Sequence, residues 1–266
     1  MSTTQMQTHL TPKPAGFVRD LIAVAGRALR AIPRELESVI PALIIPLFFF
    51  AVNVGSLSDV SKFAGVVDFK AFQLPVAIVF AVTGVSRASA LVTDIQSGYF
   101  DRLLISPVRR TALLLGLMVA DFALVIALSI PVVILGAILG VKFVTGFAGI
   151  VVFLLVSGLW GLAFTGFPYA IALKTGSPGA VNSSFLLFFP FSFLTTSFLP
   201  LEVLSGWLKT VAKFNPVTYL LEGLRSLIYV GWDGEVLLKT GTAIAIILII
   251  SFTLAFTALK GRVSRK

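Results

Sequence analysis

The sequence contains no cysteine, a single histidine and few charged residues. Without cysteine, disulfides and thiolate metal sites are excluded. The one histidine, His9, lies near the N-terminus, so no apolar segment could hold a zinc site or a histidine-dependent nucleophile. The pattern G-x-x-x-x-G-K-[ST] is also missing, which excludes ATP binding through that phosphate loop. We therefore predict no catalytic residue, no metal ligand and no cofactor bound by this chain.

Hydrophobic residues dominate the chain instead. They make up 57% of its 266 residues, charged residues make up only 12%, and the mean hydropathy is +1.00. Because soluble domains are about one-quarter charged, this composition predicts an all-α integral membrane protein. The net charge of +9 comes from Lys and Arg placed mainly between and beside the apolar runs. That placement is typical of the positive-inside rule, so membrane lipids are the expected contacts and nucleic acid is not.

Six apolar runs are long enough to cross a bilayer, which takes about 20 residues. They cover residues 38–55, 72–92, 111–140, 148–173, 179–199 and 240–259. Counting the shorter stretch 216–231 as a seventh span would place the basic C-terminus outside. The charge bias therefore predicts a multi-pass protein of the cytoplasmic (inner) membrane, with six transmembrane helices and both termini cytoplasmic.

The N-terminal region divides into two parts. Residues 1–15 are polar and contain proline, which predicts a disordered tail. Along Phe17–Ile32, by contrast, basic residues gather on one side of a helix and apolar residues on the other. Such a basic amphipathic helix is expected to lie in the membrane interface.

A first motif follows the second run, between Asp94 and Arg110. An apolar face on a short helix is expected there, with Gly98 before the helix and Pro107 after it. The apolar residues are Tyr99, Phe100, Leu103 and Leu104, and Asp101 and Arg102 flank them. An apolar face in a cytoplasmic loop must be covered either by a protein partner or by the chain's own spans, and periodicity alone does not separate these alternatives.

A second motif begins at Asn215 and Pro216, which together are a strong helix start. Polar residues then recur at helical spacing at Thr218, Glu222, Arg225 and Tyr229, so that Glu222 and Arg225 could pair. The simpler alternative is a helix in the outer leaflet with a solvated face.

Candidates for a substrate path lie in the third and fifth runs. Asp121 is charged within an apolar run, which marks a functional residue or else a packing hydrogen bond. The fifth run combines aromatic side chains with small hydroxyls, including Phe185, Phe188, Phe189, Thr195 and Thr196. These residues could line a path for a large amphiphile, or they could face lipid or pack between spans.

Together, the two motifs resemble the type 2 ATP-binding-cassette (ABC) exporter permeases, especially the daunorubicin-resistance branch. The first match comprises Asp94, Gly98, Phe100, Asp101, Arg102, Leu103, Leu104, Ser106, Pro107, Arg109 and Arg110. The second match comprises Asn215, Pro216, Tyr219, Glu222 and Arg225. The likeness covers nearly the whole chain from about Phe17.

The resemblance implies one transmembrane domain over residues 16–266. Residues 17–34 would form an elbow helix, residues 94–106 a coupling helix and residues 200–231 outer re-entrant helices. A separate ABC ATPase subunit would bind ATP and Mg, and would dock on Asp94 and Gly98–Leu104 with Pro107. Two permease subunits, identical or different, would move an amphiphilic drug, lipid or secondary metabolite outward.

Three other classes of membrane protein compete with this interpretation. A secondary transporter or channel should show internal repeats, and none is evident. An intramembrane enzyme lacks a histidine within any span. A structural scaffold would leave both motifs unexplained.

Overall fold

The computed structural model describes residues 16–34, 36–63, 65–66, 68–83, 86–106 and 108–264. Within these ranges the regular structure is helical and includes no strand, which confirms the predicted all-α class. The predicted N-terminal tail lies outside the described residues.

Eleven α-helices are found in the described ranges. Their bounds are α1 Phe17–Ala31, α2 Leu36–Phe63, α3 Phe69–Thr83, α4 Ala88–Gln96, α5 Tyr99–Ile105, α6 Arg110–Ile138, α7 Gly146–Thr175, α8 Pro178–Phe193, α9 Gly206–Phe214, α10 Pro216–Arg225 and α11 Gly234–Val263. A 3₁₀ turn, Ile32–Arg34, follows α1, and a π-helical turn, Ser226–Val230, follows α10.

Four of these helices are long and apolar enough to cross a membrane. They are α2, α6, α7 and α11, and each coincides with a predicted span. The run predicted at 72–92 is divided, because α3 ends at Thr83 and α4 begins at Ala88. Helix α8 ends at Phe193, short of the predicted residue 199. The chain is thus a multi-pass membrane protein, and the count of six spans stays a prediction.

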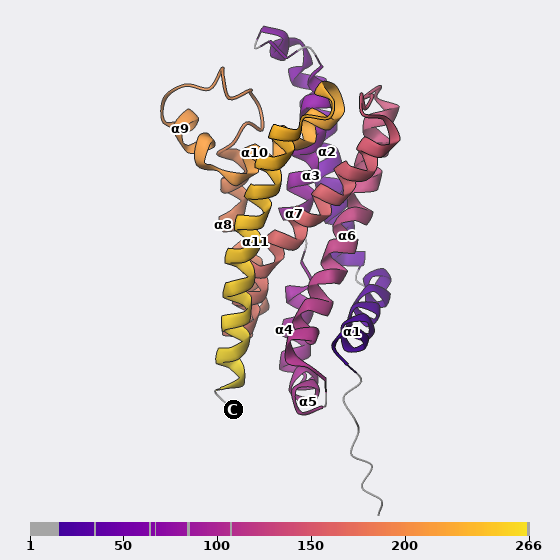
Figure 1. Cartoon of the computed structure of the whole chain (residues 1–266), viewed down its shortest axis with the longest axis vertical. Coiled ribbons are helices and arrows are strands. Elements are labelled where there is room, and N and C mark those ends of the chain that lie inside the picture. Colours follow the sequence, from indigo (N-terminus) through magenta and orange to yellow (C-terminus); the bar gives the residue numbers. More distant parts are fainter. Residues whose placement is uncertain are drawn as a thin grey trace, which may run out of the picture.

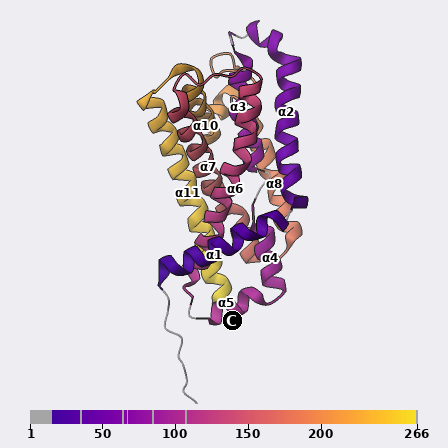
Figure 2. The same ribbon diagram turned by 90° about the vertical axis from the view of Figure 1, so that its right-hand side faces the viewer.

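The long helices run roughly side by side, so the molecule has two distinct ends (Figure 1). Helices α4 and α5 and the C-terminus lie at one end, and α9 and α10 lie at the other (Figure 1). We call these the α5 end and the α10 end. Near the α5 end, α1 crosses the long helices at a steep angle (Figure 2).

Small residues bring the central helices into close contact. A Cβ added at Gly166 of α7 would lie 2.6 Å from the backbone carbonyl carbon of Ser251 in α11. One added at Gly161 would lie 2.6 Å from a methyl carbon of Val125 in α6. Small residues at membrane helix interfaces allow such close backbone approach. The core therefore forms around α6, α7 and α11, and the shorter helices pack on it.

Candidate functional site

Helices α4 and α5 form an arm at the α5 end, with the glycine Gly98 at the bend between them. Gly98 has φ of +74°, a backbone conformation that favours glycine. The predicted coupling segment 94–106 therefore comprises the end of α4, this bend and α5. Pro107, predicted to end the helix, lies outside the described residues.

Helix α5 turns one side inward and one side outward. Phe100 is 3% exposed and packs in a cluster with Leu91, Met118 and Tyr169, and Leu104 is partly buried beside it. The chain's own helices thus cover that part of the predicted apolar face. The side chain that projects is Ile105, which is 87% exposed. Its position was missed because a helix of 7 residues has too few turns to show which face is buried.

The outward side of α5 also carries Tyr99, which is 38% exposed, and the exposed Arg102. Together with Ile105 they form an apolar surface with one basic residue. We call Tyr99, Arg102 and Ile105 the α5 face.

The arm is tied to α1 and α7 by side chains near the bend. Arg27 of α1 forms an ion pair with Asp94 at 2.9 Å, and its guanidinium lies 4.8 Å from the centre of the Tyr99 ring. The Gln96 side-chain amide donates to the carbonyl of Gly176 at 3.0 Å. Asp94 therefore positions the arm rather than projecting from it.

Asp121 is 1% exposed and lies beside the start of α4, after the break that separates α4 from α3. Its Oδ1 accepts from the backbone N–H of Arg87 at 3.1 Å, and its Oδ2 accepts from the Thr165 hydroxyl of α7 and from the Ser86 hydroxyl at 3.4 Å. The carboxylate thus joins α4, α6 and α7. Asp121 does not line the cavities described below.

Two adjoining cavities open beside α8. The first, of about 350 Å³, is an apolar groove between α2, α3 and α8, bordered by Ile45, Phe80, Leu186 and Phe189. The second, of about 600 Å³, lies toward the α5 end and has Arg27, Arg87 and Thr93 in its wall. We call them the α2–α8 groove and the α5-end cavity.

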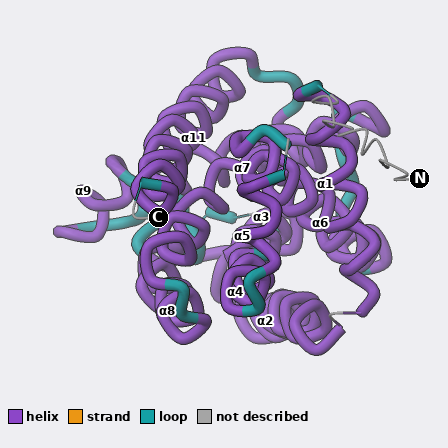
Figure 3. Tube along the Cα trace, turned by 90° about the horizontal axis from the view of Figure 1, so that it is seen from below, coloured by secondary structure: helices purple, strands orange, loops and turns teal. Residues whose placement is uncertain are grey.

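Asn182 and Phe185 border both cavities, so a polar space continues into an apolar one. Looking along the long axis, α2 and α8 lie on the same side of the bundle (Figure 3).

The predicted path residues of the fifth apolar run separate into three groups. Phe185 and Phe189 line the groove, where the Phe189 ring lies 5.7 Å from that of Phe80. Phe188 points instead to α7, with its ring 4.6 Å from that of Phe164. Thr195 and Thr196 are buried in the turn after α8. Sequence reasoning missed Asn182, a polar side chain within the aromatic run.

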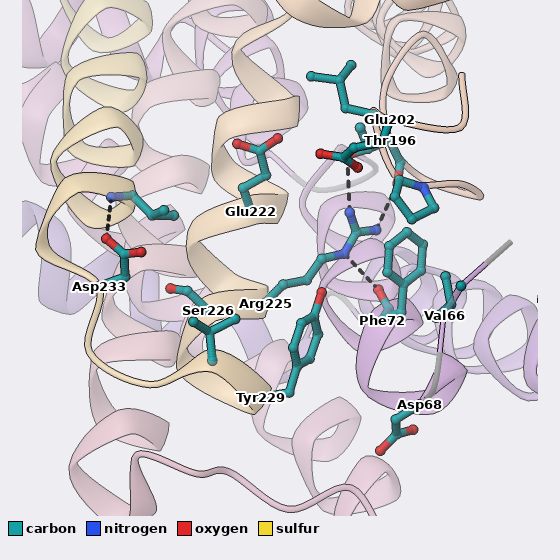
Figure 4. A pocket seen from close by; sticks show the side chains of 15 residues that line it. Val66, Asp68, Phe72, Thr196, Glu202, Glu222, Arg225, Ser226, Tyr229 and Asp233 are labelled. Atoms are coloured by element: carbon teal, nitrogen blue, oxygen red, sulfur yellow. Dashed lines mark hydrogen bonds between the residues drawn. The ribbon is translucent and has the colours of Figure 1, made fainter. Parts of the chain in front are cut away.

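At the α10 end, the buried guanidinium of Arg225 joins α10 to α3 and to the turn after α8. It donates to the Phe72 carbonyl of α3 at 3.1 Å, to the Thr196 hydroxyl at 3.1 Å and to the Thr196 carbonyl at 2.8 Å (Figure 4). Its central carbon lies 3.4 Å from the centre of the Phe72 ring. Among the described residues, these bonds replace the expected pairing with Glu222.

The predicted polar stripe on α10 is therefore not a solvated face. Thr218 and Arg225 are buried, Glu222 is half-buried and Tyr229 is 45% exposed. Burial raises the pKa of the Glu222 carboxyl above its ordinary value, and the nearby Arg225 opposes this shift. Glu222, Arg225 and Tyr229 border a cavity of about 600 Å³ between α3 and α10 (Figure 4).

The start of α10 confirms the expected helix cap. The Asn215 side-chain oxygen accepts from the Val217 N–H at 3.0 Å, and Pro216 occupies the first turn. The Asn215 amide also donates to the carbonyls of Phe191 and Leu194 at 2.9 Å, so it ties α10 to the end of α8. The Tyr219 hydroxyl donates to the Lys213 carbonyl at 2.7 Å, which joins α10 to α9.

No group of three or more His, Asp or Glu side chains that could hold a metal ion occurs in the described ranges. The geometry thus presents an exposed helix face at one end, a continuous polar-to-apolar opening beside α8, and a buried clamp at the other end.

Comparison with known proteins gives a consistent result. A sequence model of the ABC-2 type transporter family matches residues 17–229. The chain is 26% identical over 236 residues to the daunorubicin resistance ABC transporter permease protein DrrB1 of Streptomyces coeruleorubidus, covering 85% of this chain and 82% of the relative.

Two further relatives show the same extent of similarity. The probable doxorubicin resistance ABC transporter permease protein DrrC of Mycobacterium tuberculosis is 24% identical over 238 residues, covering 85% of each chain. The putative transport permease ycf38 of Pyropia yezoensis is 26% identical over 238 residues, covering 84% of this chain and 77% of the relative.

Proposed function

This chain belongs to the ABC-2 type transporter family, as a transmembrane permease subunit of an ABC exporter, and from that premise we propose a mechanism. The proposal is that the α5 face docks on a separate ABC ATPase subunit, which binds ATP and Mg. The α2–α8 groove and the α5-end cavity then take up an amphiphilic substrate. The α5 end faces the cytoplasm, and the α10 end faces outward.

The exposure of Ile105 carries the docking part of this proposal. An isoleucine that is 87% exposed at a tip beside Arg102 lies in a polar setting unless another protein covers it. A partner with an apolar pocket and an acidic rim therefore fits the α5 face best.

The two adjoining cavities support an amphiphilic substrate. The α2–α8 groove offers aromatic and aliphatic side chains, whereas Arg87 and Thr93 offer charge and a hydroxyl in the α5-end cavity. A molecule with a polar group and an apolar body could occupy both, with Asn182 at the boundary. Daunorubicin, the compound in one relative's name, is the first substrate to test.

A second permease subunit, identical or different, is proposed to close the groove. Of the four long helices, α2 buries the smallest share of its apolar stretch, 17%. Because α2 borders the groove on this open side, a second copy packed there would complete the path.

Ile105→Asp tests the docking proposal. A carboxylate at the centre of an apolar contact is expected to weaken binding of the ATPase subunit by about 2 kcal/mol, roughly 30-fold. The measurement is recovery of ATPase subunit and ATP hydrolysis after purification of the tagged permease. Ile138→Asp is the matched control, because Ile138 is 76% exposed on α6 toward the other end.

Equal recovery of the ATPase with the Ile105→Asp and Ile138→Asp variants would contradict docking at α5. Recovery of no ATPase with the unaltered permease would contradict the separate-ATPase proposal as a whole.

A further inference from the structure

We propose that Asp121 is a positioning residue for energy coupling. In this role its hydrogen bonds transmit a displacement of the α4–α5 arm to α6 and α7. This inference rests on the proposed docking of an ATPase at α5. The proposed role of Asp121 involves no contact with substrate, because the side chain is buried and does not line the groove or the α5-end cavity.

The hydrogen bonds of Asp121 connect three helices at one point. Its two oxygens accept from the Arg87 backbone at the start of α4 and from the Thr165 hydroxyl of α7, while Asp121 itself belongs to α6. Arg87 immediately precedes α4, so a carboxylate there also faces the positive end of the helix dipole. A negative charge at that position stabilises the helix start it is bonded to.

Because α3 and α4 are separate helices, this connection is a hydrogen-bonded route from the start of α4 to α6 and α7. It acts beside the packing of Phe100 against α6 and α7 and the bond of Gln96 to Gly176. A continuous helix would carry a displacement along its own hydrogen bonds, but α3 ends at Thr83 and α4 starts at Ala88. The start of α4 is bonded instead, through Arg87, to α6 and α7. Movement at the start of α4 is therefore expected to reach α6 and α7 through Asp121.

The other end of the same segment is held in a matching way. Asp20 of α1 is 6% exposed, and its Oδ2 accepts from the backbone N–H of Arg109, the residue immediately before α6. At both ends, a buried carboxylate from another helix binds the backbone N–H of the residue that precedes a helix. The ion pair of Arg27 with Asp94 adds a third connection, which joins α1 to the end of α4. Of the described residues, the segment that begins at Ser86 and the one that ends at Arg109 are thus each held by a carboxylate of another helix.

The test uses the permease purified with its ATPase subunit, and the groove itself is the reporter. Because the chain has no cysteine, Ile45→Cys with Leu186→Cys introduces the only thiol pair in the permease across the α2–α8 groove. The rate of cross-linking by a bifunctional thiol reagent is measured with and without ATP and Mg. In the otherwise unaltered complex, ATP is expected to change this rate.

Asp121→Ala is expected to keep the ATPase bound but to reduce the ATP-induced change in cross-linking rate about tenfold. Asp121→Asn retains an acceptor for the Arg87 N–H and is expected to preserve most of the response. Thr165→Val removes one bond and should fall between them. The matched control is Ser129→Ala, because Ser129 is also buried in α6 but, among the described residues, its hydroxyl donates within its own helix, to Val125.

A purely structural role predicts another pattern, in which thermal stability falls and the response to ATP of the folded complex is unchanged. A full ATP response in both Asp121→Ala and Thr165→Val would overturn the inference. Loss of the response in the unaltered complex would instead contradict the proposed function, and this inference with it.

Discussion

Arg225→Ala is expected to lower the free energy of unfolding by about 3–5 kcal/mol, the largest stability effect we predict. The substitution leaves the carbonyls of Phe72 and Thr196 buried without their donors, at about 1–3 kcal/mol each. It also removes the contact of the cation with the Phe72 ring, which adds up to about 2 kcal/mol when desolvated. Thermal unfolding of the purified permease in detergent measures the change.

Two further variants separate the causes. Arg225→Lys keeps the charge but cannot reproduce the planar fork of donors, so it should remain destabilised by about 2 kcal/mol. Glu222→Gln should change stability by less than about 0.5 kcal/mol, because the guanidinium is bonded to α3 and Thr196 instead. Destabilisation by Glu222→Gln as large as that by Arg225→Ala would contradict this assignment and favour an ion pair within α10.

Phe189→Asp is expected to slow ATP-dependent uptake of daunorubicin into inside-out vesicles about 100-fold. Phe189 lies within the aromatic wall of the α2–α8 groove, so an apolar substrate body bound there would strip water from the new carboxylate. That desolvation costs about 2.5–3.5 kcal/mol if the occupied groove is as apolar as a bilayer centre. Phe189→Leu keeps the wall apolar and should retain most of the uptake.

The matched control for this charge is Ile246→Asp. Ile246 of α11 is 52% exposed and Phe189 is 41% exposed, but Ile246 does not border the groove. Each substitution places a carboxylate at a partly exposed apolar position, so the cost to the folded permease is similar. A lower uptake with Phe189→Asp than with Ile246→Asp therefore indicates a substrate path along α8. If uptake falls equally in both variants at equal protein levels, the groove is not the path.

The long helices could be predicted from the sequence because hydropathy depends mainly on local composition. Helix α6 begins within one residue of the predicted run, and α7 and α11 contain theirs. The interruption between Thr83 and Ala88 was not predicted, because the apolar profile of residues 72–92 continues across it. The available signal was chemical: Arg87 and Asp121 each stood in an apolar run, and each required a partner.

The candidate site could be predicted less completely, because its contacts join residues that are distant in the chain. The spacing of Glu222 and Arg225 favoured a local pair, whereas the guanidinium bonds to Phe72, 153 positions away. Similarly, the spacing around Phe100 identified an apolar helix face but not the direction it faces. Burial of Phe100 and exposure of Ile105 depend on how α5 packs under α4 and α6.

The central claim is that a separate ATPase contacts this permease at α5, and a single introduced thiol tests it most directly. Ile105→Cys, carrying a photoactivatable cross-linker in native membranes, is expected to capture an ATP-binding-cassette subunit. Trp207→Cys, in an exposed position of α9 at the opposite end, is expected to capture none. Capture of the ATPase from Trp207→Cys and not from Ile105→Cys would contradict the account and reverse the proposed orientation.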